Sequence, residues 1–166
     1  MLQITPDVNT LVEGTISRTG PAGEILAAWR AGQIVLVTCE QILAQYEEVL
    51  GRPHIRSAYR HITAKTIAAS GAALRRYGTT VALAEIPAVV VDDPDDDVVL
   101  ACAVRGEADY IVSRDRHLRD LGVHQGIPIV PPERLLPILR GRVREEAATY
   151  DPAGVSSAGV SSAGVR

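Results

Sequence analysis

Short apolar segments alternate with helical patterns along most of this chain, and that alternation restricts the fold more than any other feature. Buried strands of the parallel type are expected at residues 2–5, 34–37, 110–112 and 127–130. A further strand is expected at residues 81–83 or 88–91, and we favour the second for the sheet core. The pattern predicts a three-layer α/β/α fold with a central, mainly parallel sheet of about five strands.

Capping and turn residues between the strands predict the helices. Pro21 and Pro94 suit first helical positions, Asp93 and Thr38 suit caps, and Gly106 ends a helix. The expected helices are residues 10–16, 21–31, 39–50, 52–61, 63–77, 94–105 and 131–139.

The 166 residues suit one α/β domain, which we assign to residues 1–140. Residues 141–166 are assigned to a C-terminal tail that repeats Ala-Gly-Val-Ser-Ser from Pro152 onward. Few large apolar side chains are present there to offset the entropy of ordering, so the tail is expected to be disordered.

Composition excludes several classes of protein. The net charge of −3, from 20 acidic and 17 basic residues, excludes an overall polycation but leaves room for local basic patches. Cys39 and Cys102 are too few for a zinc motif. No signal peptide or membrane-length apolar run is recognisable, so we expect a cytoplasmic protein without a membrane partner.

Acidic residues follow three of the predicted strands. Asp7 comes after the first, the aspartate-rich run 92–97 after residues 88–91, and Asp115 after residues 110–112. The carboxyl ends of parallel strands meet at one edge of a sheet, where carboxylates could hold a hard cation such as Mg²⁺. Taken singly, each aspartate is explained as well by helix capping.

Helical geometry separates the members of the run. Asp93 is the expected cap, and Asp96 shares a face with apolar residues three, four and seven positions further on, so it should point toward the core. Asp97 is rotated by about 100° and is a second candidate for the metal. Asp92 and Asp95 are expected in solvent or near the helix dipole.

Three motifs together resemble a PIN domain, most closely the toxin-like PIN family of bacterial toxin–antitoxin systems. They are Asp7-Val-Asn9, Asp-Pro-Asp-Asp-Asp-Val-Val-Leu-Ala-Cys-Ala at 93–103 and Ala-Asp-Tyr-Ile-Val-Ser-Arg-Asp at 108–115. The likeness covers roughly residues 2–140.

The resemblance implies an Mg²⁺- or Mn²⁺-dependent ribonuclease. Asp7, Asp96 and Asp115 would then be the catalytic metal ligands. Ser113 and Asn9 would support water or phosphate, although both suit turn capping equally well. The implied partners are an RNA substrate, a cognate antitoxin protein and a second copy of the chain.

One position departs from the family pattern, because Gln45 stands where a Glu is expected. Gln45 lies at the edge of the apolar face of helix 39–50, where a semi-buried ligand belongs. Glu48 lies nearly opposite that face and Glu47 at its far edge, so neither is an easy substitute. An amide oxygen can still face a cation, but it adds no negative charge and accepts no proton.

Arginines provide candidate RNA contacts. Arg52, Arg56 and Arg60 recur every four residues and would form a basic stripe on one helix, facing RNA, an acidic protein or only solvent. The arginines beside the third acid are candidates for positioning phosphates: Arg114, Arg116 and Arg119.

Three functions remain open from the sequence. The first is metal-dependent hydrolysis of RNA, as the toxin of a type II toxin–antitoxin system. The second is a PIN-like protein that binds RNA or an antitoxin and has lost catalysis through Gln45. The third is a receiver or phosphatase-like phosphotransfer domain, disfavoured because Lys65 is the only Lys and Asp7-Val-Asn9 is only half of an Asp-x-Asp motif.

Overall fold

The structure, a computed structural model, describes residues 1–90 and 93–149. Its centre is a six-stranded sheet of order β3-β2-β1-β4-β6-β5. Neighbouring strands are parallel except β5 and β6, which form an antiparallel pair. The strands are β1 (Leu2–Pro6), β2 (Ile34–Cys39), β3 (Thr79–Val81), β4 (Tyr110–Val112), β5 (Val123–His124) and β6 (Ile127–Val130).

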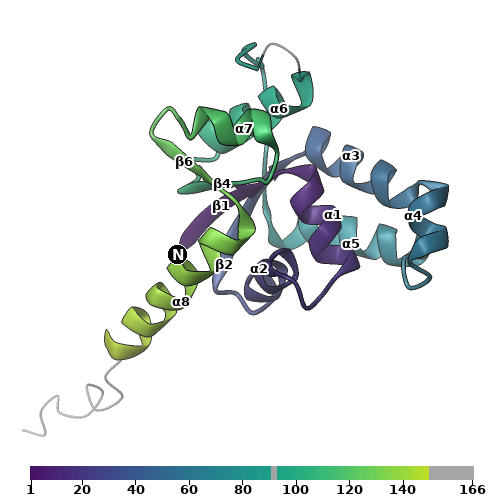
Figure 1. Ribbon diagram of the computed structural model, residues 1–166, viewed down its shortest axis with the longest axis horizontal. Coiled ribbons are helices and arrows are strands. Elements are labelled where there is room, and N and C mark those ends of the chain that lie inside the picture. The colour runs from purple at the N-terminus through teal and green to yellow at the C-terminus, as the bar shows by residue number, and fades with distance from the viewer. Residues whose placement is uncertain (91–92, 150–166) are drawn as a thin grey trace, which may run out of the picture.

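Helices flank this sheet and complete the three-layer α/β/α architecture (Figure 1). Helix α6 packs on β1, β2 and β4, while α1 packs against α2 and α3, and α3 packs against α5. The helices are α1 (Val8–Ile16), α2 (Pro21–Arg30), α3 (Glu40–Gly51), α4 (Pro53–Ala58), α5 (Ala64–Tyr77), α6 (Pro94–Arg105), α7 (Arg116–Leu121) and α8 (Pro132–Thr149).

One predicted strand is wrong. Residues 88–90 form no strand, and the edge of the sheet is instead β3, parallel to β2. The backbone N–H groups of Val89 and Val90 donate to Oδ1 of Asp97, at 2.9 and 2.7 Å, so they are used by a side chain and not by a neighbouring strand. The remaining residue of the predicted segment, Val91, lies outside the described residues.

Several element ends also differ from the predictions. Strand β2 continues to Cys39, which replaces Thr38 as the N-cap of α3. Helix α4 is shorter than expected because it ends at Ala58, whereas α8 continues to Thr149, into the range assigned to the tail. Helix α7 and the short β5 were not predicted. The disorder expected for residues 150–166 lies outside the described residues.

The order of the strands fixes where a site can form. From β1 the chain adds β2 and β3 on one side, and β4 and β6 on the other. In parallel sheets the crevice for ligands lies at the carboxyl ends of the strands where this order reverses, here between β1 and β4. Within the described residues, no helix is long and apolar enough to cross a membrane.

Candidate active site

Asp7 stands at the carboxyl end of β1 and caps α1. Its Oδ1 accepts a hydrogen bond of 2.7 Å from the backbone N–H of Thr10, as an N-cap residue does. Its own backbone N–H donates to the carbonyl of Val112 at 3.0 Å, which fixes the end of β1 beside the end of β4. The side chain is buried, and this burial raises the pKa of Asp7.

Ser113 connects the ends of β1 and β4. Its fully buried hydroxyl donates to Oδ2 of Asp7 and accepts a 2.9 Å hydrogen bond from the backbone N–H of Asp115. The sequence left open whether Ser113 supports the site or caps a turn, and in the structure it contacts both strand-end acids. One hydroxyl therefore sets the positions of Asp7 and of the residue two places after β4.

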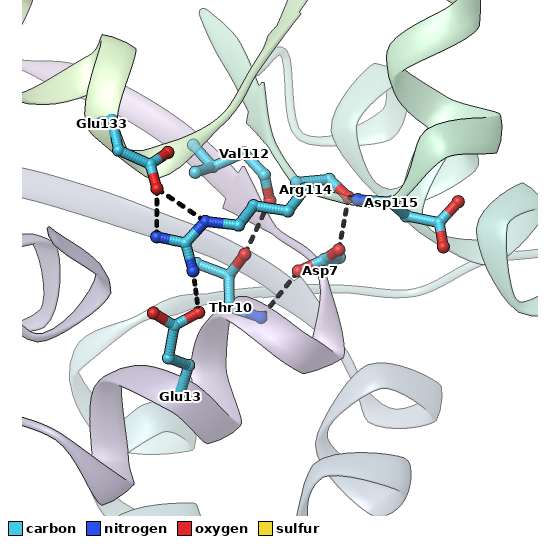
Figure 2. A network of polar contacts seen from close by, with 8 residues as sticks. Asp7, Thr10, Glu13, Val112, Arg114, Asp115 and Glu133 are labelled. Atoms are coloured by element: carbon cyan, nitrogen blue, oxygen red, sulfur yellow. Dashed lines mark hydrogen bonds and ion pairs between the residues drawn. The ribbon is translucent and has the colours of Figure 1, made fainter. Parts of the chain in front are cut away.

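Asp115 is the N-cap of α7 and is half-buried. Its Oδ1 accepts from the backbone N–H of His117 at 2.8 Å. Figure 2 shows Asp7 and Asp115 beside the end of β4, with Val112 and Thr10 close to Asp7. The negative charge of Asp115 contributes to the raised pKa of Asp7, so the two carboxylates interact.

Asp96 completes the group from the first turn of α6. It is only 7% exposed, as its position on the helical face predicted, and its Oδ2 has no hydrogen-bond partner among the described residues. Burial, followed by the negative charges of Asp115, Asp93 and Asp7, raises the pKa of Asp96 to about 7. The structure thus brings the three predicted acids together from three separate segments.

These acids suit a hard divalent cation. Mutual repulsion and an unbonded buried oxygen are both relieved when positive charge enters the site. In the part of the chain that is described, no three or more His, Cys, Asp or Glu side chains form a ready-made metal cage. Mg²⁺ usually keeps several of its waters when it binds protein carboxylates, so these acids would not have to enclose it.

The neighbouring residue Asp97 is equally buried but has other contacts. Its Oδ1 accepts the two backbone N–H groups of Val89 and Val90, which fixes the segment that leads toward α6. The structure therefore gives Asp97, our second candidate for the metal, a part in holding this segment.

Gln45 is half-buried on α3, as its place at the edge of the apolar face predicted. Its Nε2 donates to Oδ2 of Asp95 at 2.7 Å, which joins α3 to the first turn of α6. Asp95, expected in solvent, is exposed but has this partner. Glu48 is exposed and pairs with Arg52, so it stays away from the acids, as predicted.

The matching family model decides the family. It is described as PIN domain and covers residues 5–117, a range that contains Asp7, Gln45, Asp96 and Asp115. The chain belongs to the PIN-domain family. PIN domains are commonly nucleases and typically use divalent metal ions, which agrees with the three grouped acids and disfavours the phosphotransfer alternative. No curated protein matches the chain.

The arginines predicted to position phosphates in this PIN domain differ in their surroundings. Arg114 forms ion pairs with both Glu13 and Glu133, and Figure 2 shows its guanidinium between them, away from the Asp115 carboxylate. These two ion pairs join the end of β4 to α1 and α8. Arg114 therefore has a structural role here and not the phosphate contact that its sequence position suggested. Arg116 is 90% exposed with a 3.6 Å pair to Asp120, and Arg119 is exposed.

Two further residues complete the comparison with the sequence. Asn9 is exposed on the first turn of α1, and its side chain forms no hydrogen bond within the described residues. His117 was not singled out, yet its charge is among those that act on Asp96. Helix α7 was not predicted from the sequence. Without a helix that begins after Asp115, there was no reason from the sequence to place His117 near the acids. Asp92, the first member of the aspartate run, lies outside the described residues.

Proposed function

We propose that this PIN domain is an Mg²⁺- or Mn²⁺-dependent endoribonuclease, acting as the toxin of a type II toxin–antitoxin system. The observation that carries the proposal is Oδ2 of Asp96, a buried carboxylate oxygen without a hydrogen bond. It lies within electrostatic reach of Asp7 and Asp115. Buried polar groups are nearly always hydrogen-bonded, so an unbonded carboxylate oxygen close to two other acids supports a place for a bound cation.

Each residue of the site would have a defined task. Asp7, Asp96 and Asp115 would hold the ion, which when bound supplies an activated water and stabilises charge on the attacked phosphate. Ser113 keeps one oxygen of Asp7 occupied, so that the carboxylate keeps a single orientation. Arg116, which pairs with Asp120 at 3.6 Å, and Arg119 are exposed on α7, where they would approach phosphate groups. A cytoplasmic location, an antitoxin and a homodimer belong to the same proposal.

A second candidate function is an RNA- or antitoxin-binding protein without catalysis. It is favoured by the hydrogen bond from Gln45 to Asp95, because here an amide donor occupies a position where the family pattern expects an acid. An amide at that position lowers the negative charge available to a cation.

Cleavage of single-stranded RNA with Mg²⁺ or Mn²⁺ distinguishes the two functions. The nuclease proposal predicts that Asp96→Asn abolishes cleavage and that Gln45→Glu maintains or raises it. Glu85→Gln is the control, since this exposed carboxylate undergoes the same chemical change away from α7 and its arginines. Equal, metal-independent cleavage by all variants would reject the nuclease and favour the binding protein.

A further inference from the structure

Basic residues are unevenly distributed along the chain. Residues 49–84 contain six of the 17 basic residues and none of the 20 acidic ones. The net charge of −3 therefore hides a positive segment, which includes α4 and the turn into α5. Phosphate binding depends on such local distributions and not on the total charge.

The arginine side chains of this segment differ in whether they form ion pairs. Arg52 pairs with Glu48 at 2.9 Å, and Arg75 pairs with Glu40 and Glu47. Arg56 and Arg60, in contrast, are exposed and have no ion pair or side-chain hydrogen bond within the described residues.

The predicted single stripe is altered, because α4 ends at Ala58 and Arg60 lies in the turn beyond it. Arg56 and Arg60 nevertheless line one hollow of about 500 Å³, together with Ser57, Ile62 and Thr63. Two unpaired guanidinium groups at one hollow are suited to two successive phosphates.

An aromatic side chain stands in the same segment. Tyr59 is 40% exposed, although large apolar rings are usually covered, and its ring makes an edge contact with His61 at 6.3 Å between centroids. This contact orients the Tyr59 ring. Positive grooves with exposed aromatic rings bind single-stranded nucleic acids, since the rings stack on unpaired bases.

We propose that Arg56, Tyr59 and Arg60, together called the α4 surface, bind single-stranded RNA outside the site of cleavage. The two arginines contact phosphates and Tyr59 stacks on a base. Helix α3 is joined to the first turn of α6 through Gln45 and leads to α4 (Figure 1), and Gln45 and Gly51 are about 9 Å apart along its axis. The inference rests on the proposed function in taking RNA as the substrate, and adds where a neighbouring stretch of it lies.

Binding measured without cleavage tests this surface. A fluorescein-labelled single-stranded RNA is titrated with the full chain in EDTA, at several salt concentrations, and fluorescence anisotropy gives the affinity. The double variant Arg56→Ala/Arg60→Ala should lower the slope of log affinity against log salt by about 1.4, because each lost phosphate contact removes about 0.7. The control, Arg134→Ala/Arg142→Ala, removes two exposed arginines of α8 and should leave the slope unchanged.

Tyr59 tests the stacking contact separately. Tyr59→Ala should weaken binding about fivefold or more, whereas Tyr59→Phe keeps the ring and should bind as the natural chain does. Circular dichroism melting confirms that these variants fold. Equal affinity losses for Ala and Phe, or equal slopes for the two arginine double variants, would overturn the proposal.

Two further outcomes separate this inference from the proposed function. Loss of binding to a polyglutamate peptide in Arg56→Ala/Arg60→Ala, with RNA binding unchanged, would assign the surface to an acidic protein and overturn the proposal. RNA binding that depends on the α4 surface, in a chain that cleaves nothing, supports the surface and rejects the nuclease. Cleavage by a chain whose RNA binding does not depend on the α4 surface would support the nuclease and overturn this inference.

Discussion

A single hydroxyl group fixes the relative position of two acids that lie more than a hundred positions apart. Ser113 donates to Asp7 and accepts from the backbone of Asp115, and all three follow the ends of neighbouring parallel strands. Because the hydroxyl is fully buried, water cannot replace these contacts. The geometry of the site therefore depends on a residue that is not itself expected to hold the metal.

Replacing Ser113 with Ala should destabilise the fold by about 1–3 kcal/mol, the range for leaving a buried polar partner unsatisfied. Asp7 loses a donor that lowers its pKa, so its carboxylate becomes harder to keep ionised. Urea unfolding gives the free energy. The control Ser57→Ala is exposed and should change it by less than about 0.5 kcal/mol. Similar losses for both variants would contradict the bridging role.

The raised pKa of Asp96 makes stability depend on pH in the absence of metal. The pKa is about 7 in the folded chain against 3.8 as its ordinary value, so the folded state binds this proton more tightly than the unfolded state. The stabilisation that comes from this bound proton is complete below about pH 3.8 and is lost as the pH rises to about 7.

We therefore expect Asp96→Asn to have a higher melting temperature than the natural chain at pH 8 in EDTA. The difference between the two should shrink toward pH 4. Thermal unfolding followed by circular dichroism measures it, and a difference that is constant from pH 4 to pH 8 would contradict the assigned pKa.

Helix α6 turns two adjacent aspartates toward different elements. Successive residues of a helix are about 100° apart. Asp96 therefore faces the acids, while Asp97 accepts the backbone N–H groups of residues 89 and 90. The helix thus joins the site to the segment that precedes it. Because Asp97 anchors one side of the first turn of α6, the neighbouring Asp96 is held in place beside the other acids.

Asp97→Ala should release this segment and leave the strand ends unaffected. Hydrogen exchange should accelerate at the amides of Val89 and Val90, which lose their acceptor, but not at Thr10, which is held by Asp7. Mass spectrometry of exchanged peptides checks this. The comparison variant is Asp120→Ala, an exposed carboxylate that accepts no backbone hydrogen bond. Unchanged exchange at Val89 and Val90 would contradict the anchoring role.

Close packing of α2 supplies another prediction. A Cβ at Gly23 would lie 2.2 Å from the carbonyl oxygen of Ser17 and 2.7 Å from that of Arg18, both on rigid backbone. Gly23→Ala should therefore cost about 1–3 kcal/mol. At Gly51, in α3, a Cβ would meet nothing within 4 Å, so Gly51→Ala should be neutral or stabilising by up to about 1 kcal/mol. Urea unfolding of both variants measures the contrast.

Across the whole molecule, three distant segments supply negative charge to one place. Strand β1, helix α6 and the turn after β4 meet only because β1 lies at the centre of the sheet, next to β4, with α6 packed across both. The repulsion between the acids is a cost of this arrangement, and a bound cation would offset it. Metal binding should therefore raise the stability of the folded protein.

We expect Mg²⁺ to raise the melting temperature of the natural chain at pH 8, because a ligand that binds only the folded state stabilises it. The increase should be larger for Gln45→Glu, which adds a charge, and should disappear in Asp96→Asn. Asp120→Asn should respond as the natural chain does. An equal response from all four proteins would assign the effect to ionic strength and not to the acids.

Local pattern determined much of this protein. The apolar runs predicted β1, β2, β4 and β6, and the helical period predicted that Asp96 is buried while Glu48 is exposed. Asp93 caps α6 as expected. These features follow from forces between residues a few positions apart, and the sequence displays those spacings directly.

Contacts between distant residues decided the rest. Asp97 accepts the backbone N–H groups of Val89 and Val90, which are then unavailable to a neighbouring strand, so the edge strand is β3 and not residues 88–90. Arg114 meets Glu13 and Glu133, and so it lies away from the acids that its sequence position suggested. A side chain pairs with the group that lies closest to it in the folded protein. Which residues that are distant in sequence lie close together is decided by the packing of the tertiary structure.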